Sequence, residues 1–158
     1  MIQQRSRLPA VMMLLALLAF GVGMGFARKG VSPSKVQAEI VRLKAEVAKP
    51  NAKWQTWLEY GNALRDGQQY VDAILAYDQV LKADPYQKDA RLQGSLCRAT
   101  LGSRTDADKE GFLKFMGETV ELDPRLAKAI FERPDIASFL SDERFRKLNK
   151  TAIDQSQD

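Results

Sequence analysis

The chain has 158 residues, which is enough for one domain and a short additional segment. It contains no histidine and a single cysteine, Cys97. Serine–histidine and cysteine–histidine nucleophiles, histidine metal sites and an intramolecular disulfide are therefore excluded. The formal net charge is +4, but four of the 24 basic residues precede residue 30, and the 20 that follow are matched by 20 acidic residues. This balance gives little affinity for phosphates, so we expect no nucleic-acid partner.

Residues 8–27 form the first distinct segment, with the sequence LPAVMMLLALLAFGVGMGFA and no charged side chain. The charged residues on either side are Arg5, Arg7, Arg28 and Lys29. A helix of about 20 apolar residues matches the roughly 30 Å hydrocarbon core of a bilayer. We therefore predict an N-terminal membrane anchor of the signal-anchor type over residues 1–29, with residues 8–27 in contact with lipid.

A cleaved signal peptide is the alternative, since Gly25-Phe26-Ala27 resembles a small-residue cleavage site. The apolar segment is longer than the about 7–15 residues usual in signal peptides, and Arg28-Lys29 resembles a stop-transfer flank. The orientation of the anchor stays open, because basic residues flank both of its ends.

Residues 30–34 are interpreted as a linker, followed by an amphipathic helix that ends near Ala48. Ser34 stands three residues before Gln37, which is the spacing of a capping box. The apolar stripe of this helix consists of Val36, Ile40, Leu43 and Val47, and its opposite face has the pairs Lys35/Glu39 and Arg42/Glu46. Two heptads are too few to hold a coiled-coil dimer, so we expect the helix to pack on the segment that follows.

Residues 54–87 contain two apolar stripes with helical spacing, separated by the turn signal Asp66-Gly67. The first stripe consists of Trp57, Leu58, Tyr60, Ala63 and Leu64, and the second of Ala73, Ile74, Tyr77, Val80 and Leu81. Gly61 and Ala73 are small enough for two antiparallel helices to approach closely, and Tyr77 can fill the space beside them. These features predict a helical hairpin whose core includes Trp57.

The order of Trp57, Gly61, Ala73, Tyr77 and Pro85 resembles the consensus of the tetratricopeptide repeat (TPR) family. A degenerate second repeat follows: Gly94 and Cys97 stand 33 residues after Gly61 and Leu64, whereas Phe112, Met116 and Asp123-Pro124 stand 39 residues after Ala73, Tyr77 and Asp84-Pro85. We expect the extra residues to lie in a polar loop at 102–109. The resemblance thus implies a clear repeat at about 54–87 and a degenerate one at about 88–124.

The C-terminal segment 125–150 is predicted to be a helical cap, with helices at 125–132, from Asp135 and from about Asp142, and a break at Pro134. Phe139, Phe145 and Leu148 would cover the last apolar face of the stack, as terminal units of repeat arrays do. Residues 151–158 are expected to form a flexible tail. The predicted fold class is therefore all-α: an N-terminal transmembrane helix, then a short TPR-like helical solenoid over residues 35–150 with about seven short helices.

In the TPR family, the first helix of each repeat lines a concave surface that binds a partner peptide. The resemblance implies that this surface contains Gln55, Leu58, Asn62, Arg65, Arg91, Ser95 and Arg98. The three arginines of this set and Asn62 could hold carboxylates of an extended acidic or C-terminal peptide, since guanidinium groups pair with carboxylates. A solvated helix face with an ordinary share of charge is the alternative. The chaperone-binding carboxylate clamp is disfavoured, because Leu58 and Leu92 stand where lysine and asparagine are expected.

Nothing in the sequence predicts a catalytic residue, a cofactor, a metal or a small-molecule substrate. Asp106, Asp108 and Glu110 are the nearest approach to an acidic cluster, and we interpret them as solvated loop charges. The anchor and hairpin resemble those of bacterial single-pass membrane-anchored TPR proteins, whose repeats usually face the periplasm and serve assembly of envelope or cytochrome complexes.

This resemblance implies a non-catalytic protein–protein interaction or scaffold module in the bacterial inner membrane, with the soluble domain in the periplasm. A cytoplasm-facing domain is the alternative orientation. The alternative functions are a permanent structural subunit of a larger membrane complex and a TPR assembly factor similar to those of cytochrome c maturation.

Overall fold

The computed structural model describes residues 32–157. The predicted anchor at 1–29, including its apolar segment, lies outside the described residues. Within 32–157 all regular structure is helical, which confirms the all-α prediction for this part of the chain. None of the helices there is long and apolar enough to cross a membrane.

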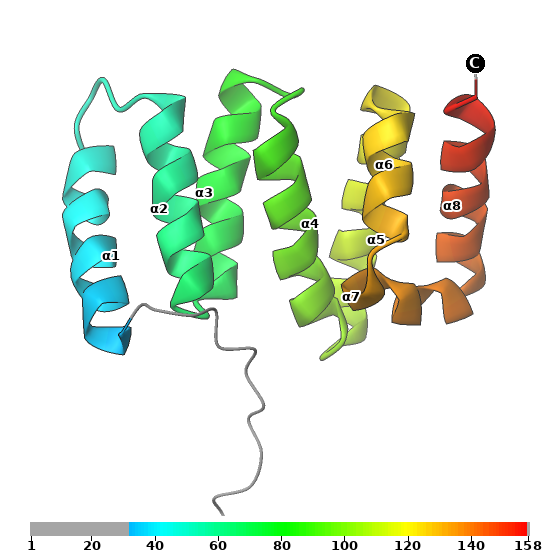
Figure 1. Cartoon of the computed structure of the whole chain (residues 1–158), viewed down its shortest axis with the longest axis horizontal. Helices are drawn as coiled ribbons and strands as arrows, with labels where there is room; N and C mark the ends of the chain where they lie inside the picture. Colours follow the sequence, from blue (N-terminus) through cyan, green and yellow to red (C-terminus); the bar gives the residue numbers. More distant parts are fainter. Residues whose placement is uncertain (1–31, 158) are drawn as a thin grey trace, which may run out of the picture. The chain divides into compact units, whose positions relative to one another are not determined.

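Eight α-helices and one 3-10 helix follow one another between residues 33 and 155 (Figure 1). They are α1 Pro33–Val47, α2 Trp54–Asp66, α3 Tyr70–Ala83, α4 Lys88–Gly102, α5 Asp106–Leu122, α6 Pro124–Phe131, α7 Pro134–Ala137, the 3-10 helix η1 Ser138–Ser141 and α8 Glu143–Gln155. From α1 to α6 each helix packs against the next, and α4 also touches α2 and α6. The successive long helices run in opposite directions, so that α1–α5 form stacked antiparallel pairs.

Two apolar clusters form the core, and α4 contributes to both. The first cluster joins α1–α4 and contains Ile40, Leu43, Ala63, Leu64, Ala73, Ala76, Tyr77, Val80, Ala90 and Cys97. The second joins α4–α8 and contains Ala99, Phe112, Met116, Val120, Ala127, Ile130, Phe131, Ile136, Phe139, Phe145 and Ala152. Burial raises the pKa of the Cys97 thiol to about 11, so this side chain is a protonated apolar core residue at neutral pH.

The hairpin of α2 and α3 is built around the contact between Gly61 and Tyr77. A Cβ atom at Gly61 would lie 2.7 Å from Cε1 of Tyr77, so only glycine allows this approach. The Tyr77 ring is fully buried, and its hydroxyl donates a hydrogen bond of 2.9 Å to Oδ1 of Asn62. Trp57 and Tyr60 are only half-buried at the edge of the first cluster. Tyr77 is therefore a central core residue, whereas Trp57, which the sequence also placed in the core, lies at its edge.

The first helix begins and pairs its charges differently from the prediction. α1 starts at Pro33, inside the expected linker, and Pro33 occupies the first helical turn after Ser32. The expected capping box at Ser34 and Gln37 is therefore not formed. Arg42 pairs with Glu39 at 2.6 Å and Glu46 pairs with Lys49 at 2.6 Å, both at a spacing of three residues.

The predicted polar loop at 102–109 is much shorter in the structure, because α5 already begins at Asp106. Thr105 is the N-cap, and its Oγ1 accepts a hydrogen bond of 3.1 Å from the backbone N–H of Asp108. Asp106 and Asp108 lie in the first turn, where the helix dipole favours negative charge. The prediction of a long loop was wrong because acidic residues such as Asp106 and Asp108 are typical of loops but are also preferred in the first turn of a helix.

The C-terminal segment closes the second cluster with three phenylalanine rings. The ring centroids of Phe112, Phe139 and Phe145 are 5.0–5.3 Å apart. α8 continues to Gln155, so most of the tail that the sequence predicted to be flexible is helical. The reason is Ala152, which is fully buried in the second cluster and extends the apolar stripe of α8 by two turns beyond Phe145.

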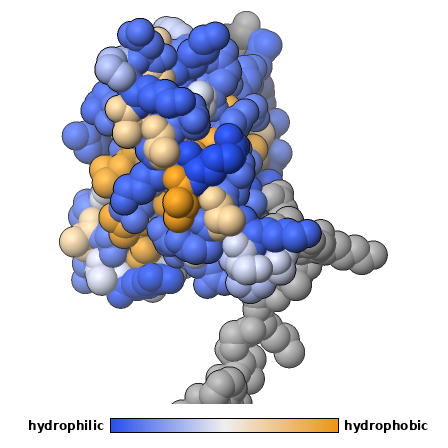
Figure 2. Space-filling model, turned by 90° about the vertical axis from the view of Figure 1, so that its left-hand side faces the viewer, coloured by the Kyte–Doolittle hydropathy of each residue, from blue (hydrophilic) through white to orange (hydrophobic). Residues whose placement is uncertain are grey.

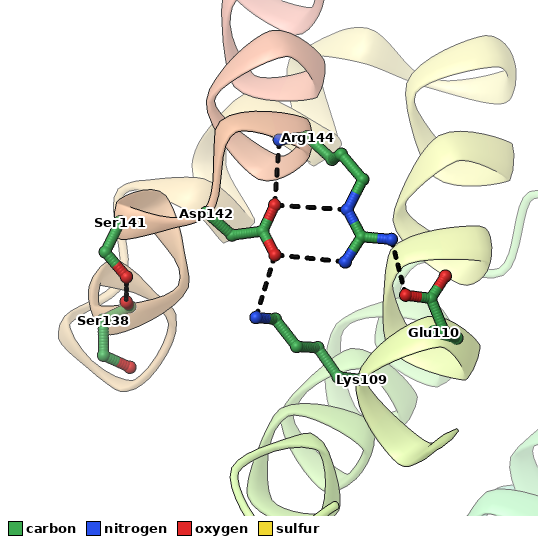
Figure 3. A network of polar contacts seen from close by, with 6 residues as sticks. All are labelled: Lys109, Glu110, Ser138, Ser141, Asp142 and Arg144. Atoms are coloured by element: carbon green, nitrogen blue, oxygen red, sulfur yellow. Dashed lines mark hydrogen bonds and ion pairs between the residues drawn. The ribbon is translucent and has the colours of Figure 1, made fainter. Parts of the chain in front are cut away.

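A polar network fastens the start of α8 to α5 (Figure 3). Asp142 caps α8 by accepting a hydrogen bond of 2.9 Å from the backbone N–H of Arg144. The same carboxylate is 2.8 Å from Nζ of Lys109 and 3.1 Å from Nη2 of Arg144, while Nη1 of Arg144 reaches Glu110. The hydrogen bonds from Arg144 and Lys109 hold the pKa of Asp142 well below its usual range.

Replacing Asp142 with asparagine is expected to lower the free energy of unfolding at neutral pH, because asparagine can keep the helix cap but loses both ion pairs. A depressed carboxylate pKa stabilises the folded state above the pKa of the unfolded chain, which is about 4, and this stabilisation is lost as the pH falls toward the folded-state pKa. The difference from the wild type should therefore shrink below about pH 4 in urea titrations. Asp135→Asn is the control, since Asp135 is an exposed carboxylate outside this network. A difference that does not change between neutral and acidic pH would contradict the prediction.

The outer face of α1 is partly apolar. Val41 is 61% exposed, and Ala38 and Ala45 are exposed on the same side of the helix. Figure 2, which views the molecule from the side of α1, shows apolar residues between hydrophilic ones on this surface. Among the described elements, α1 packs only against α2.

Candidate partner-binding groove

The four predicted site residues of α2 have different surroundings. Gln55 is exposed, and Leu58 is half-buried against the first cluster. Asn62 accepts the hydrogen bond from Tyr77 described above. Arg65 donates through Nη1 to Oε1 of Gln93 on α4 and through Nη2 to Oδ1 of Asp66 at 2.8 Å. Asn62 and Arg65 thus already hold neighbouring helices together.

Arg91 is a buried residue of α4, with 5% of its surface exposed. Its Nε donates to the carbonyl oxygen of Pro85 at 2.7 Å and its Nη1 donates to Oγ1 of Thr119 on α5 at 3.2 Å. Burial lowers the pKa of Arg91 from its ordinary value. Ser95, one turn further along α4, is fully buried and donates to the carbonyl oxygen of Leu92 at 2.7 Å. Arg91 therefore connects α4 to α5 and to the turn before α4, whereas the hydrogen bond of Ser95 stays within α4.

Arg98 of α4 contacts both neighbouring helices, α3 and α5. Its Nη2 lies 2.7 Å and 2.9 Å from the two carboxylate oxygens of Asp78 on α3. Its guanidinium carbon is 4.0 Å from the centroid of the Phe115 ring on α5. Arg91 approaches the same ring at 5.6 Å. Cation–π contacts with one ring thus hold both arginines on the face of α4 that is turned toward α3 and α5.

This face of α4 forms the floor of a groove of about 430 Å³ between α3 and α5. The groove is lined by Asp78, Leu81 and Lys82 from α3, by Arg91 and Arg98 from α4, and by Gly111, Lys114, Phe115 and Glu118 from α5. Within the described part of the chain, no Cα atom of α3 lies within 8 Å of one in α5, so the two walls are separate. Of the seven predicted residues, the groove brings together only Arg91 and Arg98.

The remaining lining residues were missed by the sequence interpretation. Asp78/Lys82 and Lys114/Glu118 are opposite charges four residues apart, a signal that marks an exposed helix face. That signal could have singled out one face of each helix. It could not show that the two faces meet across α4, because this depends on tertiary packing. The partner-binding role of the seven residues stays a prediction.

A second hollow, of about 490 Å³, lies between the α4–α5 turn and η1. Its lining includes the hydroxyl groups of Ser103, Thr105, Ser138 and Ser141. Lys109, which also lines it, is paired with Asp142 in the network of Figure 3. Arg104 is the other basic residue of the lining, and its guanidinium carbon lies 6.0 Å from the centroid of the Tyr70 ring.

Comparisons of the chain with protein-family models, with curated proteins and with solved structures found no match. The interpretation as a tetratricopeptide-like protein therefore depends on the residue spacing and on the packing of the helices.

Proposed function

We propose that the chain is a non-catalytic, membrane-anchored protein–protein interaction module with a TPR-like helical solenoid. The observation that supports this best is the repeated packing of helix pairs beside an open groove. Gly61 on α2 packs closely against Tyr77 on α3, and Gly94, 33 residues later on α4, lies between Tyr77 on α3 and Phe115 on α5, with a Cβ there 3.7 Å and 3.8 Å from their side chains. Stacked helical repeats present extended surfaces of this kind, and such proteins use them to bind other proteins.

The membrane part of the proposal comes from residues 8–27, which have the length and apolarity of a spanning helix. α1 begins six residues after Ala27, so an anchor there would hold the domain close to the bilayer surface. We place the domain in the periplasm of a bacterial inner membrane by resemblance, with a cytoplasmic domain as the alternative. A module in this position would recruit or assemble a partner at the membrane.

Carbonate washing of membranes tests the anchor. We expect the full chain to stay in the washed membrane pellet and a variant lacking residues 1–29 to be released into the soluble fraction. Protease added to intact spheroplasts should cleave the domain if it faces the periplasm. Release of the full chain by carbonate would contradict an uncleaved anchor, and a shortened mature chain would support the signal-peptide alternative.

Photo-crosslinking of the full chain in its native membranes tests recruitment. A crosslinking amino acid at an exposed groove position, such as Lys114, is expected to capture a protein partner. The same group at Lys150 on α8, outside the groove, is the control. Purification from detergent as a stable particle with several subunits would favour the permanent-subunit alternative, and the absence of any crosslinked protein would contradict the recruitment proposal.

A further inference from the structure

We infer that the groove between α3 and α5 binds an acidic, extended peptide segment of a partner protein. The inference rests on the proposed function, because it assigns the binding surface and the chemistry of the partner. It moves the binding surface from the seven residues of α2 and α4 that the sequence suggested to a groove between α3 and α5, which includes only Arg91 and Arg98 of those seven. Three independent features of the groove support it.

The first feature is the excess of positive charge. Four basic side chains line the groove against two acidic ones, Asp78 and Glu118. Asp78 is already bound to Arg98. Lys82 and Lys114 are exposed on opposite walls, and neither forms an ion pair with another residue in the described range. Carboxylates placed between the two lysines would therefore be attracted from both sides.

The second feature is the buried guanidinium of Arg91. Both of its hydrogen-bond acceptors, the Pro85 carbonyl oxygen and the Thr119 hydroxyl, are uncharged. No ion pair joins it to a carboxylate among residues 32–157. The carboxylates of Glu118 and Asp123 act on Arg91 without forming an ion pair with it. A carboxylate bound directly against Arg91 in the groove would lower the cost of burying its charge. The position of Arg91 on the floor places such a contact at the bottom of the groove.

The third feature is Gly111, an exposed glycine in the interior of α5. Glycine in a helix is less favourable than alanine by about 0.8–1 kcal/mol of stability. At Gly61 the close contact with Tyr77 explains why glycine is present. At Gly111 a Cβ atom would meet no atom within 4 Å, so the packing of the chain does not require glycine. A larger side chain would occupy the groove instead. Glycine here keeps the wall low and leaves room for a ligand backbone.

The size and charge of the groove favour a peptide over a nucleic acid. Pockets that bind small ligands measure about 300–1,000 Å³, and the volume of about 430 Å³ accommodates a few residues of extended chain. Nucleic-acid binding needs a broad basic surface. The chain after residue 30 has equal numbers of basic and acidic residues, so the positive region is local.

The test uses the purified full chain in detergent and two fluorescein-labelled peptides, the acidic GEDEVEDEG and its amide counterpart GQNQVQNQG. Fluorescence anisotropy is expected to show binding of the acidic peptide at least about tenfold tighter than that of the amide peptide. The double variant Lys82→Glu with Lys114→Glu should weaken acidic-peptide binding by about tenfold or more. Lys147→Glu with Lys150→Glu is the matched control, because it changes the net charge equally at exposed positions of α8.

A steric variant tests the groove without changing any charge. Gly111→Leu is expected to fold, since the space above the backbone is open and leucine has a better helix propensity than glycine. Its thermal melt, followed by circular dichroism, should be at least as high as that of the wild type. We expect it to lose acidic-peptide binding by about tenfold or more, whereas Gly111→Ala should fold and keep binding.

Four outcomes would overturn the inference: equal binding of the acidic and amide peptides, equal weakening by the two lysine pairs, unchanged binding by a folded Gly111→Leu variant, or equal competition by a single-stranded oligothymidylate. The last outcome would indicate a surface for polyanions in general. Crosslinking in membranes separates this inference from the proposed function. A partner that the wild type captures in membranes, together with failure of the peptide tests, would leave the interaction module intact and overturn only the inference about the groove. Capture of no partner by the wild type would contradict the module itself.

Discussion

Replacement of Tyr77 by alanine is expected to lower the free energy of unfolding by about 3–5 kcal/mol, the range for removal of a large buried aromatic side chain. Tyr77 is fully buried, fills the space beside Gly61 and donates a hydrogen bond to Asn62. A loss of this size is a large part of the roughly 5–15 kcal/mol that stabilises a typical domain. Urea unfolding followed by circular dichroism measures it.

Trp57→Ala is the informative comparison for this result. The hairpin pattern suggested that Trp57 is part of the core, but in the structure it is half-buried and has an edge-to-face contact with Tyr60 at 6.3 Å. We therefore expect a smaller loss for Trp57→Ala than for Tyr77→Ala. A larger loss for Trp57→Ala than for Tyr77→Ala would contradict the packing described for α2 and α3.

Replacement of Phe145 by alanine is expected to have a comparable effect, again about 3–5 kcal/mol, but at the other end of the domain. Phe145 is fully buried and contacts both Phe112 and Phe139. Its loss removes the main apolar anchor of α8 on α5. Limited proteolysis should then cut near Asp142, ahead of α8, earlier than in the wild type.

Val41→Ala serves as the control for Phe145→Ala, because Val41 is a largely exposed apolar residue on α1. It should leave the thermal melt and the proteolytic pattern nearly unchanged. A Phe145→Ala variant that melts like the wild type would mean that α8 is not held by the second cluster.

The sequence predicted best what depends on local spacing. The hairpin of α2 and α3 follows from two apolar stripes with a turn signal between them. The break at Pro134 also appears, as the start of the short helix α7. In each case the deciding residues lie within a few positions of one another.

The sequence was less informative where a second element decides the outcome. The extent of α8 depends on Ala152, a small residue that becomes a core position only because the second cluster receives it. The direction of Arg91 depends on Phe115 and Thr119, which belong to another helix. A helical wheel of α4 places Arg91 and Arg98 on one stripe, but it contains no information on whether solvent or a neighbouring helix covers that stripe.

The surroundings of Arg91 and Arg98 in the structure change the choice of variants that test the groove. From the sequence alone, reversing the charges of Arg91 and Arg98 should abolish partner capture without unfolding the domain. In the structure Arg91 is buried and Arg98 is bound to Asp78, so glutamate at either position would also disturb the fold. The exposed Lys82 and Lys114 test the same groove with less risk to stability.

The attachment of α1 by a single neighbour has a consequence for how the domain opens. α4 is held by helices on both sides, whereas α1 is held only through its contact with α2 among the described elements. Opening of α1 would leave the second cluster intact. The amide hydrogens of α1 should therefore exchange with solvent faster than those of α4. If residues 8–27 are fixed in a bilayer, mechanical tension on the chain reaches α1 first. This helix would then unwind under load while the groove between α3 and α5 keeps its shape.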